Sequence, residues 1–384
     1  MSEQQPNSVD IDKWLKLIRA DGVGPVTFAK LIKHFNSIEK VFGASVAQLT
    51  KVRGIDYPTA EKILRSLGKF EAEAELELAH KLGVCVIHLN DQRYPTLLKN
   101  IYDPPPVLYI KGNVTKDDNL CIAIVGSRRC STYGKEQASR FAHLLSSAGF
   151  TICSGLARGI DTAAHHGAIA ANGRTIAVQG CGLASVFPPE NKELFDSIAK
   201  SGACLSELPL TSHPDRANFP PRNRMIAGLS LATIVIEAAQ RSGALITAHS
   251  ALEYNREVMA IPGKIDSPFS KGTHQLIKQG AKLIESVQDV IEALGYIGRQ
   301  IDDHVCTQAE KTQKNIETPL FDVSKLKLSD DEKIIYDCLA DEPMHIEQII
   351  GEVDLAPGSI NAQLISLRLK GLIKQLPGSM FLKI

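Results

Sequence analysis

The sequence lacks the marks of several protein classes. Its 384 residues contain no apolar run near the roughly 20 residues that cross a bilayer, and Met1–Asp10 is polar rather than signal-like. The formal net charge is zero, which argues against a nucleic-acid surface spread over the whole protein. We therefore expect a soluble, cytoplasmic protein in which any site for a polyanion is local.

Common cofactor and metal signatures are missing as well. No G-x-G-x-x-G spacing follows the strand-like runs and no Gly-Lys-Ser/Thr occurs, so a dinucleotide cofactor and ATP hydrolysis are unsupported. The eight cysteines include no C-x-x-C pair, and we expect reduced thiols packed as small hydrophobic side chains. His165 and His166 are adjacent, and adjacent helical positions point in different directions. We expect no metal and no cofactor.

The middle of the chain alternates short apolar runs with helix-like stretches. Runs buried on both sides with helices between them predict a parallel sheet covered on both faces. Ligands of such sheets bind outside the carboxyl ends of the strands. The expected strands are 121–125, 150–153, 175–178, 203–205, 231–236, 258–261 and 282–284, and the expected helices include 134–148, 160–171, 191–200, 244–254 and 272–280.

Smaller modules flank this core. Gly turns at residues 21–25 and 51–55, each followed by an amphipathic stretch, resemble helix-hairpin-helix units; whether they hold a DNA phosphate or only pack is left open. Near the carboxyl end, three helical segments and a hairpin are typical of a winged helix, for which we favour a protein-contact or structural role. The predicted organisation is a helical domain over 1–106, a core over 107–297, a linker over 298–327 and a winged helix over 328–384.

Four short signatures occur in a fixed order within the core. Each follows or adjoins an apolar run, where backbone amides and positive helix ends meet anions. Residues 107–290 hold 19 Lys and Arg against 15 Asp and Glu, so this region is mildly basic and suits a polyanion. The signatures are Gly126–Arg128, Ser154–Asp161, Phe219–Arg224 and Glu237–Gly243.

The first two signatures predict a phosphate-binding loop pair. Gly126 allows a ligand close to the backbone, Ser127 offers a hydroxyl and an N–H, and Arg128 is a planar fork suited to phosphate oxygens. The loop from Ser154 to Gly159 is expected to aim its amides at an anion. Asp161 is either a catalytic acid or a helix cap, and we favour the cap.

The last two signatures predict a basic, aromatic surface. Thr211–Pro221 is expected to be a long loop on which Phe219 stacks bases while arginines follow the phosphates. The alternative, that Phe219 fills the core and the arginines are salt-bridged, stays open. Glu237 is interpreted as holding a neighbouring arginine rather than as an acid or base, and Ser242-Gly243 begins the next helix.

Taken together, these motifs resemble the DNA-processing protein A (DprA, or Smf) family. The resemblance rests on S-R-R-C-S-T-Y-G, S-G-L-A-R-G-I-D-T-A-A, F-P-P-R-N-R-M-I-A-G, E-A-A-Q-R-S-G-A-L-I-T and A-I-P-G, spread over about 180 residues. One departure is Asn255, where the family usually has a glycine. The implied fold is α/β, an extended Rossmann-like parallel sheet core with an N-terminal helix-hairpin-helix (SAM-like) domain and a C-terminal winged helix.

The resemblance also implies a function without catalytic turnover. The family binds and protects incoming single-stranded DNA during natural transformation, loads the RecA recombinase, and forms a homodimer through its core. An alternative is a nucleotide-binding or phosphoribohydrolase-type Rossmann enzyme that uses Glu237 or Asp161. The candidate DNA- and phosphate-binding residues are Gly126, Ser127, Arg128, Ser154, Gly155, Arg158, Gly159, Arg216, Phe219, Arg222, Arg224, Ser242 and Gly243, with Asp161, Asn223 and Glu237 in support.

Overall fold

The computed structural model describes residues 8–295, 330–339, 344–353, 355, 360, 363–364, 367, 373–376 and 380–383. The chain divides into two compact units, Met1–Cys306 and Thr307–Ile384, and each is described by itself. The linker predicted over residues 298–327 lies outside the described residues. Among the described residues, no helix has the length and apolar character needed to cross a membrane.

The first unit begins with the helical module that the sequence predicts. Gly22 and Gly54 have φ of 85° and 91°, in the left-handed region that favours glycine. A Cβ on Gly22 would lie 3.3 Å from Thr59 Cγ2, and one on Gly54 would lie 3.3 Å from Lys30 Nζ. Each turn therefore packs against the helix that follows the other turn. The helices are α1 (Ser8–Ile18), α2 (Pro25–Phe35), α3 (Ile38–Phe42), α4 (Val46–Leu49), α5 (Tyr57–Ser66) and α6 (Ala72–Leu82).

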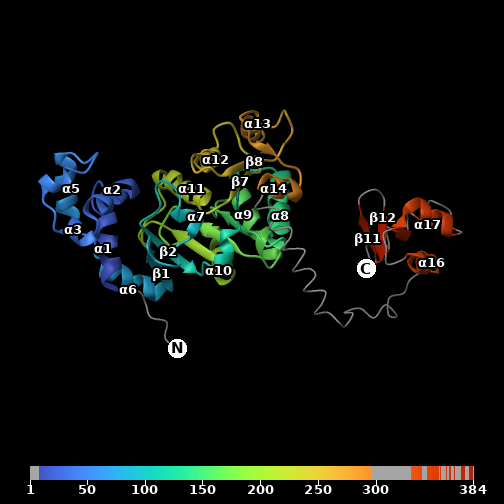
Figure 1. Cartoon of the computed structure of the whole chain (residues 1–384), viewed down its shortest axis with the longest axis horizontal. Coiled ribbons are helices and arrows are strands. Elements are labelled where there is room, and N and C mark those ends of the chain that lie inside the picture. Colours follow the sequence, from blue (N-terminus) through green and yellow to red (C-terminus); the bar gives the residue numbers. More distant parts are fainter. Residues whose placement is uncertain are drawn as a thin grey trace. The chain divides into compact units, whose positions relative to one another are not determined.

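A nine-stranded sheet forms the centre of this unit (Figure 1). Its order is β1-β2-β6-β5-β4-β3-β7-β8-β9. The seven strands from β6 to β9 in this order run parallel, as predicted, whereas β1 and β2 are an antiparallel extension that the sequence analysis missed. The strands are β1 (Val84–His88), β2 (Val107–Gly112), β3 (Cys121–Val125), β4 (Thr151–Ser154), β5 (Thr175–Val178), β6 (Ala203–Ser206), β7 (Ala232–Val235), β8 (Glu257–Ala260) and β9 (Lys282–Leu283).

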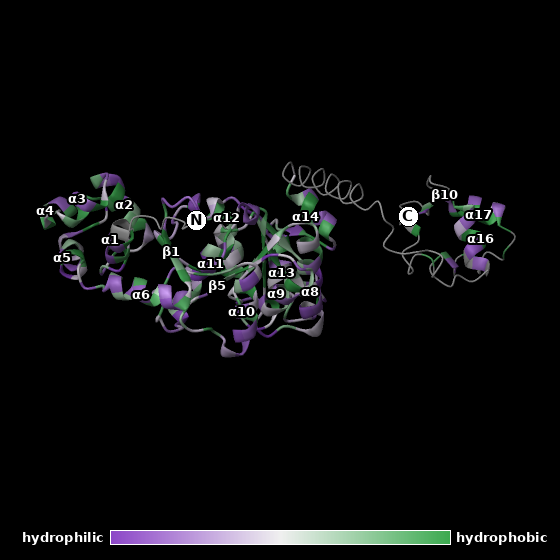
Figure 2. Ribbon diagram, turned by 90° about the horizontal axis from the view of Figure 1, so that it is seen from below, coloured by the Kyte–Doolittle hydropathy of each residue, from purple (hydrophilic) through white to green (hydrophobic). Residues whose placement is uncertain are grey.

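Helices cover both faces of the sheet. Alternate residues of a strand point to opposite faces, so each strand packs against helices on both sides. In β3, Ile122 and Ile124 pack with α8, α9 and α14, whereas Ala123 and Val125 pack with α11, α12 and α13. The central strands are coloured as hydrophobic in Figure 2. The covering helices are α7 (Thr96–Lys99), α8 (Thr132–Ser147), α9 (Ile160–Ala170), α10 (Lys192–Ser201), α11 (Phe219–Gly228), α12 (Ala244–Glu253), α13 (Lys271–Lys278) and α14 (Val287–Ala293).

The helical module and the sheet share one hydrophobic cluster. Trp14 and Leu31 of the module belong to the same buried cluster as Tyr109 of β2 and Phe195 of α10. Polar contacts reinforce the junction, since Glu75 Oε1 accepts from the Leu210 N–H at 2.7 Å. The module is therefore packed onto the sheet within this unit.

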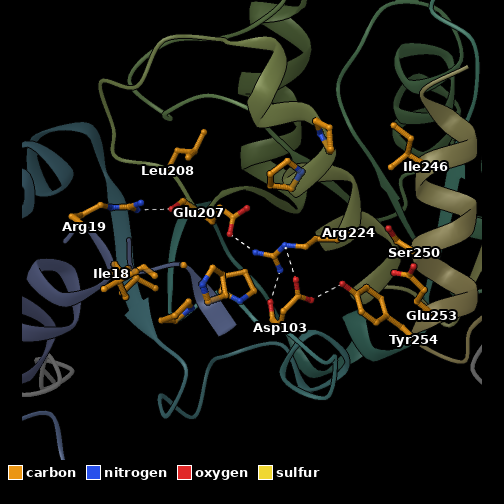
Figure 3. A pocket seen from close by; sticks show the side chains of 18 of the residues that line it. Ile18, Arg19, Asp103, Glu207, Leu208, Arg224, Ile246, Ser250, Glu253 and Tyr254 are labelled. Atoms are coloured by element: carbon orange, nitrogen blue, oxygen red, sulfur yellow. Dashed lines mark hydrogen bonds and ion pairs between the residues drawn. The ribbon is translucent and has the colours of Figure 1, made fainter. Parts of the chain in front are cut away.

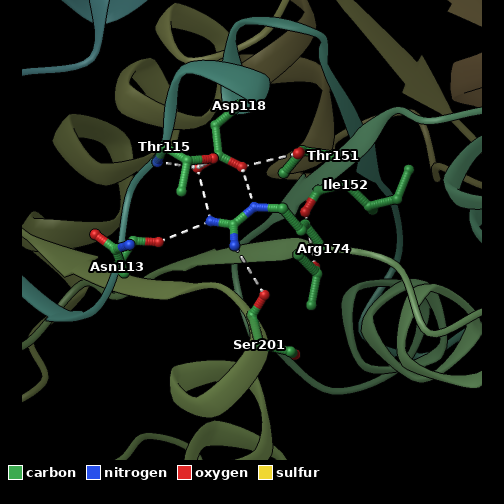
Figure 4. A network of polar contacts seen from close by, with 8 residues as sticks. Asn113, Thr115, Asp118, Thr151, Ile152, Arg174 and Ser201 are labelled. Carbon is green, nitrogen blue, oxygen red and sulfur yellow. Dashed lines mark hydrogen bonds and ion pairs between the residues drawn. The ribbon is translucent and has the colours of Figure 1, made fainter.

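The amino edge of the sheet is fastened by one ion pair (Figure 4). The Arg174 guanidinium donates to both oxygens of Asp118 at 2.9 Å, and also to the carbonyl oxygens of Asn113 and Ser201. Thr151 donates to the same carboxylate at 2.8 Å. Because these residues come from the starts of β4 and β5 and the end of α10, the network fixes the edge opposite to the predicted site.

The second unit contains the helices and antiparallel strands of a winged helix. Its three strands lie in the order β10-β12-β11, and helical residues 360, 363–364 and 367 fall within the predicted third helix. Ile335, Ile349 and Phe381 form its core. Arg368 and Lys370, the two cations in the sequence of the predicted third helix, lie outside the described residues. The elements are α16 (Asp330–Cys338), β10 (Met344–His345), α17 (Ile346–Glu352), β11 (Ile373–Leu376) and β12 (Met380–Lys383).

Candidate nucleic-acid interface

The predicted signatures meet at the carboxyl edge of the sheet. Gly126 follows β3, Gly155 follows β4 and Glu237 lies two residues beyond β7. These strands are parallel neighbours, so their following loops lie at one edge. The loops also touch, because Ser127 N donates to the Glu237 carbonyl at 2.8 Å and Ile160 N donates to the Ser127 carbonyl at 3.3 Å.

Gly126 and Gly159 let two of these loops approach closely. A Cβ on Gly126 would lie 2.6 Å from Ile160 Cγ1, and one on Gly159, where φ is 82°, would lie 2.5 Å from the Ser127 carbonyl oxygen. Ser127 is committed to the loop itself, since its hydroxyl donates to the Arg129 carbonyl at 2.7 Å. The prediction that Ser127 offers free donors to a phosphate is therefore wrong.

The loop after β4 already has an anion, namely Asp161. The Asp161 carboxylate accepts from Gly155 N at 3.2 Å and from Ala157 N at 3.4 Å. These two predicted phosphate donors are therefore used inside the protein. Ser154 is also internal, because its buried hydroxyl donates to the Ile124 carbonyl at 2.7 Å. Burial raises the pKa of Asp161, and the charge of Arg222 opposes part of that rise.

Arg128, Phe219 and Arg222 line a small pocket at this edge. The pocket has a volume of about 50 Å³, and Arg158, Gly155, Gly180 and Phe187 are among its other lining residues. The Arg128 guanidinium lies 4.6 Å from the centroid of the Phe219 ring, and Arg222 lies 5.7 Å from it. The exposed Arg128 forms no ion pair within the described part of the chain. This is an aromatic ring with an exposed cation over it, which suits a nucleobase and its phosphate.

Arg222 forms the buried floor of that pocket. Its side chain is only 5% exposed, and Nη1 donates to the Val178 carbonyl at 3.2 Å. Burial lowers the pKa of Arg222, while the Asp161 carboxylate acts in the opposite direction. Its Nε has no hydrogen-bond partner among the described residues. Arg222 therefore adds positive potential from below rather than gripping a polymer from outside.

Arg224 is held by partners inside the protein, which Figure 3 shows. Its guanidinium donates to Glu207 Oε2 at 2.5 Å and to the Asp103 carbonyl at 2.6 Å, and it pairs with the Asp103 carboxylate at 3.4 Å. Arg224 lines a separate, larger pocket of about 750 Å³ together with Arg19 and Tyr254. The salt-bridged alternative is thus correct for Arg224, and we remove it from the candidate DNA contacts.

The chain around Phe219 is helical where a loop was predicted. A short 3-10 turn spans Arg216–Asn218, and α11 begins at Phe219, so that Pro220 and Pro221 lie in its first turn. Proline is well suited to that position, since its missing N–H has no helical partner there. Arg216 is exposed on the turn, and Asn223 Nδ2 donates to the Gly243 carbonyl at 3.2 Å, which joins α11 to α12.

Glu237 holds a helix start rather than an arginine. Its carboxylate accepts from the backbone N–H of Ser131 at 2.9 Å and from the Ser131 hydroxyl. Ser131 is the N-cap of α8. The predicted arginine-holding role is therefore wrong. Ser242 is likewise local, because its hydroxyl accepts from Ala244 N at 3.3 Å at the start of α12.

Arg158 and His165 both have partners within the protein. Arg158 is exposed and pairs with Glu190. His165 is fully buried and its Nδ1 contacts Thr175 Oγ1 at 2.7 Å, while burial lowers its pKa to about 3. His165 is thus a neutral core residue. Over the described residues, no group of three or more His, Cys, Asp and Glu is arranged to hold a metal ion.

Gly180, Phe187 and Pro188 also line the pocket and were missed by the sequence analysis. Phe187 follows β5 and its ring centroid lies 6.1 Å from that of Phe219. Gly180 supports the other ring closely, since a Cβ there would lie 3.0 Å from Phe219 Cδ1. Gly180 lies two residues beyond β5, where the strand-end rule that found the other loops applies, whereas Phe187 lies nine residues beyond it and carries no such signal.

Comparison with known proteins supports one family over nearly the whole chain. Residues 85–295 match the model of "DNA recombination-mediator protein A", residues 322–379 match the "DprA winged helix domain" and residues 15–69 match a "SAM-like helix-hairpin-helix tandem". The chain is 37% identical to protein Smf of Synechocystis over 95% of its own length and 96% of that protein.

Two solved structures are similar as well. The X-ray structure of DNA processing protein A from Streptococcus pneumoniae has a TM-score of 0.64 and 35% identity, and the match covers 75% of this chain and 98% of that one. The structure of DNA processing protein A from Helicobacter pylori, described as giving insight into its unique single-stranded DNA binding mode, has a TM-score of 0.50 and 30% identity. That match covers 55% of this chain and 95% of the other.

Proposed function

The chain belongs to the DNA-processing protein A (DprA/Smf) family, and from that membership we propose that it binds single-stranded DNA at the carboxyl edge of its sheet. The observation that carries the proposal is the stack of Arg128 on Phe219, 4.6 Å from the ring centroid, above a pocket floored by Arg222. An aromatic face and unpaired guanidinium groups together are the elements of a single-strand site.

The contacts around the pocket assign the predicted residues to two roles. Arg128, Arg216 and Phe219 are the proposed direct contacts, because all three are at least partly exposed. The glycines, Ser127, Ser154 and the carboxylates Asp161 and Glu237 hold the loops in place. Arg158 joins the direct contacts when it exchanges Glu190 for a phosphate. Ser242 and Gly243 contribute the start of α12 beside them.

We further propose the role that family membership suggests. The protein protects incoming single-stranded DNA in the cytoplasm during natural transformation, loads the RecA recombinase onto it, and acts as a homodimer through its core. No catalytic turnover is proposed, because Asp161 and Glu237 are each engaged by backbone amides. Incubation with nucleoside monophosphates tests this point: release of free base that is lost in Glu237→Gln would favour the enzyme alternative.

Salt titration of DNA binding tests the site directly. The logarithm of affinity for single-stranded oligothymidylate should fall with the logarithm of salt concentration with a slope of about −0.7 for each phosphate contacted. Arg128→Ala should weaken binding and reduce this slope by about one contact. Lys200→Ala is a matched control, since Lys200 is an exposed cation at the far end of α10. Unchanged affinity and slope in Arg128→Ala would exclude this loop as the site.

A further inference from the structure

A second exposed aromatic lies at the same edge of the sheet, outside the pocket. Tyr133 is 46% exposed and belongs to the first turn of α8. Its hydroxyl donates to the Pro262 carbonyl at 3.4 Å, so the ring is tethered between the start of α8 and the loop that follows β8. A tethered ring loses less conformational freedom when a base stacks on it.

Two exposed cations lie close in sequence to Tyr133 or to Pro262, the residue that its hydroxyl contacts. Arg129 precedes it by four residues in the loop after β3, and Lys264 lies two residues beyond Pro262, to which the Tyr133 hydroxyl is bonded. Neither side chain forms an ion pair, hydrogen bond or ring contact with the described residues. Both charges are therefore available to an external anion.

From this arrangement we propose a second nucleotide-binding patch, made of Arg129, Tyr133 and Lys264, that extends the single-strand site. A base stacks on Tyr133 while the flanking cations meet phosphates. The patch is continuous with the first site, because Arg128 and Arg129 are neighbours and the chain from Arg128 to Tyr133 spans at most about 18 Å. This inference rests on the proposed function, since it extends the same polymer along the edge.

The test compares two lengths of oligothymidylate. A strand of about six nucleotides can occupy the site at Phe219, and one of about twenty can also reach Tyr133. Compact single-strand sites cover roughly 4–16 nucleotides. Tyr133→Ala should weaken binding of the longer strand by roughly 5- to 150-fold and leave the shorter strand unaffected. Tyr133→Phe keeps the ring but loses the bond to Pro262, so its affinity for the longer strand should lie between that of the wild type and that of Tyr133→Ala. Arg129→Ala and Lys264→Ala should each reduce the salt slope for the longer strand by about 0.7.

A spectroscopic variant gives an independent readout. Trp14 is the single tryptophan, so Tyr133→Trp in a Trp14→Phe background places the indole signal on the patch. Its fluorescence should be quenched by the longer strand and not by the shorter one. If the wild type binds neither strand, the proposed function fails. If it binds both, and Tyr133→Ala binds the longer strand as the wild type does, only the second patch is overturned.

Discussion

Replacing Gly155 by alanine should disturb the floor of the pocket. A Cβ at this position would lie 1.4 Å from Arg222 Nη1 and 2.8 Å from Asp161 Oδ2. Arg222 is buried and donates to the Val178 carbonyl, so a retreat of its guanidinium leaves that carbonyl without this donor and weakens the attraction to the neighbouring Asp161 carboxylate.

The expected cost follows from two contributions. Overpacking a tight core site costs about 1–3 kcal/mol, and loss of a hydrogen bond to a charged group costs about 1.5–3 kcal/mol. Together they predict that Gly155→Ala lowers the free energy of unfolding by about 2.5–6 kcal/mol. It should also weaken DNA binding, because Arg222 would no longer lie beneath Phe219.

Urea unfolding followed by Trp14 fluorescence measures the effect. Trp14 is buried in the cluster that the helical module shares with the sheet, so it reports on the whole first unit. With a slope of about 1–3 kcal/mol per molar urea, the midpoint should fall by roughly 1 M or more. Gly243→Ala is the matched control at the same edge, because its φ is −61° and nothing lies within 4 Å of its added Cβ. Equal midpoints for Gly155→Ala and Gly243→Ala would refute this account of the floor.

Two further predictions concern charge inside the first unit. Arg174→Ala should lower the free energy of unfolding by about 2–3 kcal/mol, because it leaves the buried Asp118 carboxylate without its cation; a urea midpoint equal to that of the exposed control Lys200→Ala would contradict this. The pKa of His165 is lowered to about 3 in the folded protein, whereas an unfolded histidine titrates near 6.5. The unfolded state therefore binds more protons between these values, and stability is complete above about pH 6.5 and falls as the pH drops toward 3. The loss between pH 7 and 5 should be about 2 kcal/mol and should disappear in His165→Gln, as measured by urea midpoints at both pH values.

The parallel strands could be predicted because their burial is simple. Runs such as Cys121–Val125 are apolar on both faces and stand between helices, and the structure places a strand at each predicted run. β1 was missed because Val84–His88 follows a helix directly and is only partly buried. The start of α11 was missed because Pro220-Pro221 was interpreted as a loop, although proline is compatible with the first helical turn.

The position of the site could be predicted, but the partners of its residues could not. The rule that loops after parallel strands converge brought Arg128 and Glu237 to one edge. Whether the amides after β4 meet an outside phosphate or Asp161 depends on the path of the loop. The opposite directions of Arg222 and Arg224 follow from helix geometry, since positions two apart do not face each other. The different directions of Arg222 and Arg224 could not be predicted without knowing that both lie in a helix that begins at Phe219.

Asn255 shows how one departure from the family pattern is tolerated. Its φ is 56°, in the left-handed region where glycine is favoured and asparagine is the next best residue. The family glycine at this position therefore has a conformational reason, and the substitution keeps the turn. The same reasoning predicts that a β-branched residue here would strain the backbone by about 1–2 kcal/mol.

The cluster that joins Trp14 and Leu31 to Tyr109 and Phe195 has a consequence for truncation and for evolutionary change. A shortened protein that starts at β1 would turn the Tyr109 ring and its neighbours toward water, and each large side chain so exposed loses about 1.5–3 kcal/mol. A homologue that has lost the first helices must therefore carry polar substitutions on this surface, or another segment must cover it. Because the helical module and the sheet share this hydrophobic cluster, loss of one of them in evolution requires compensating substitutions in the other.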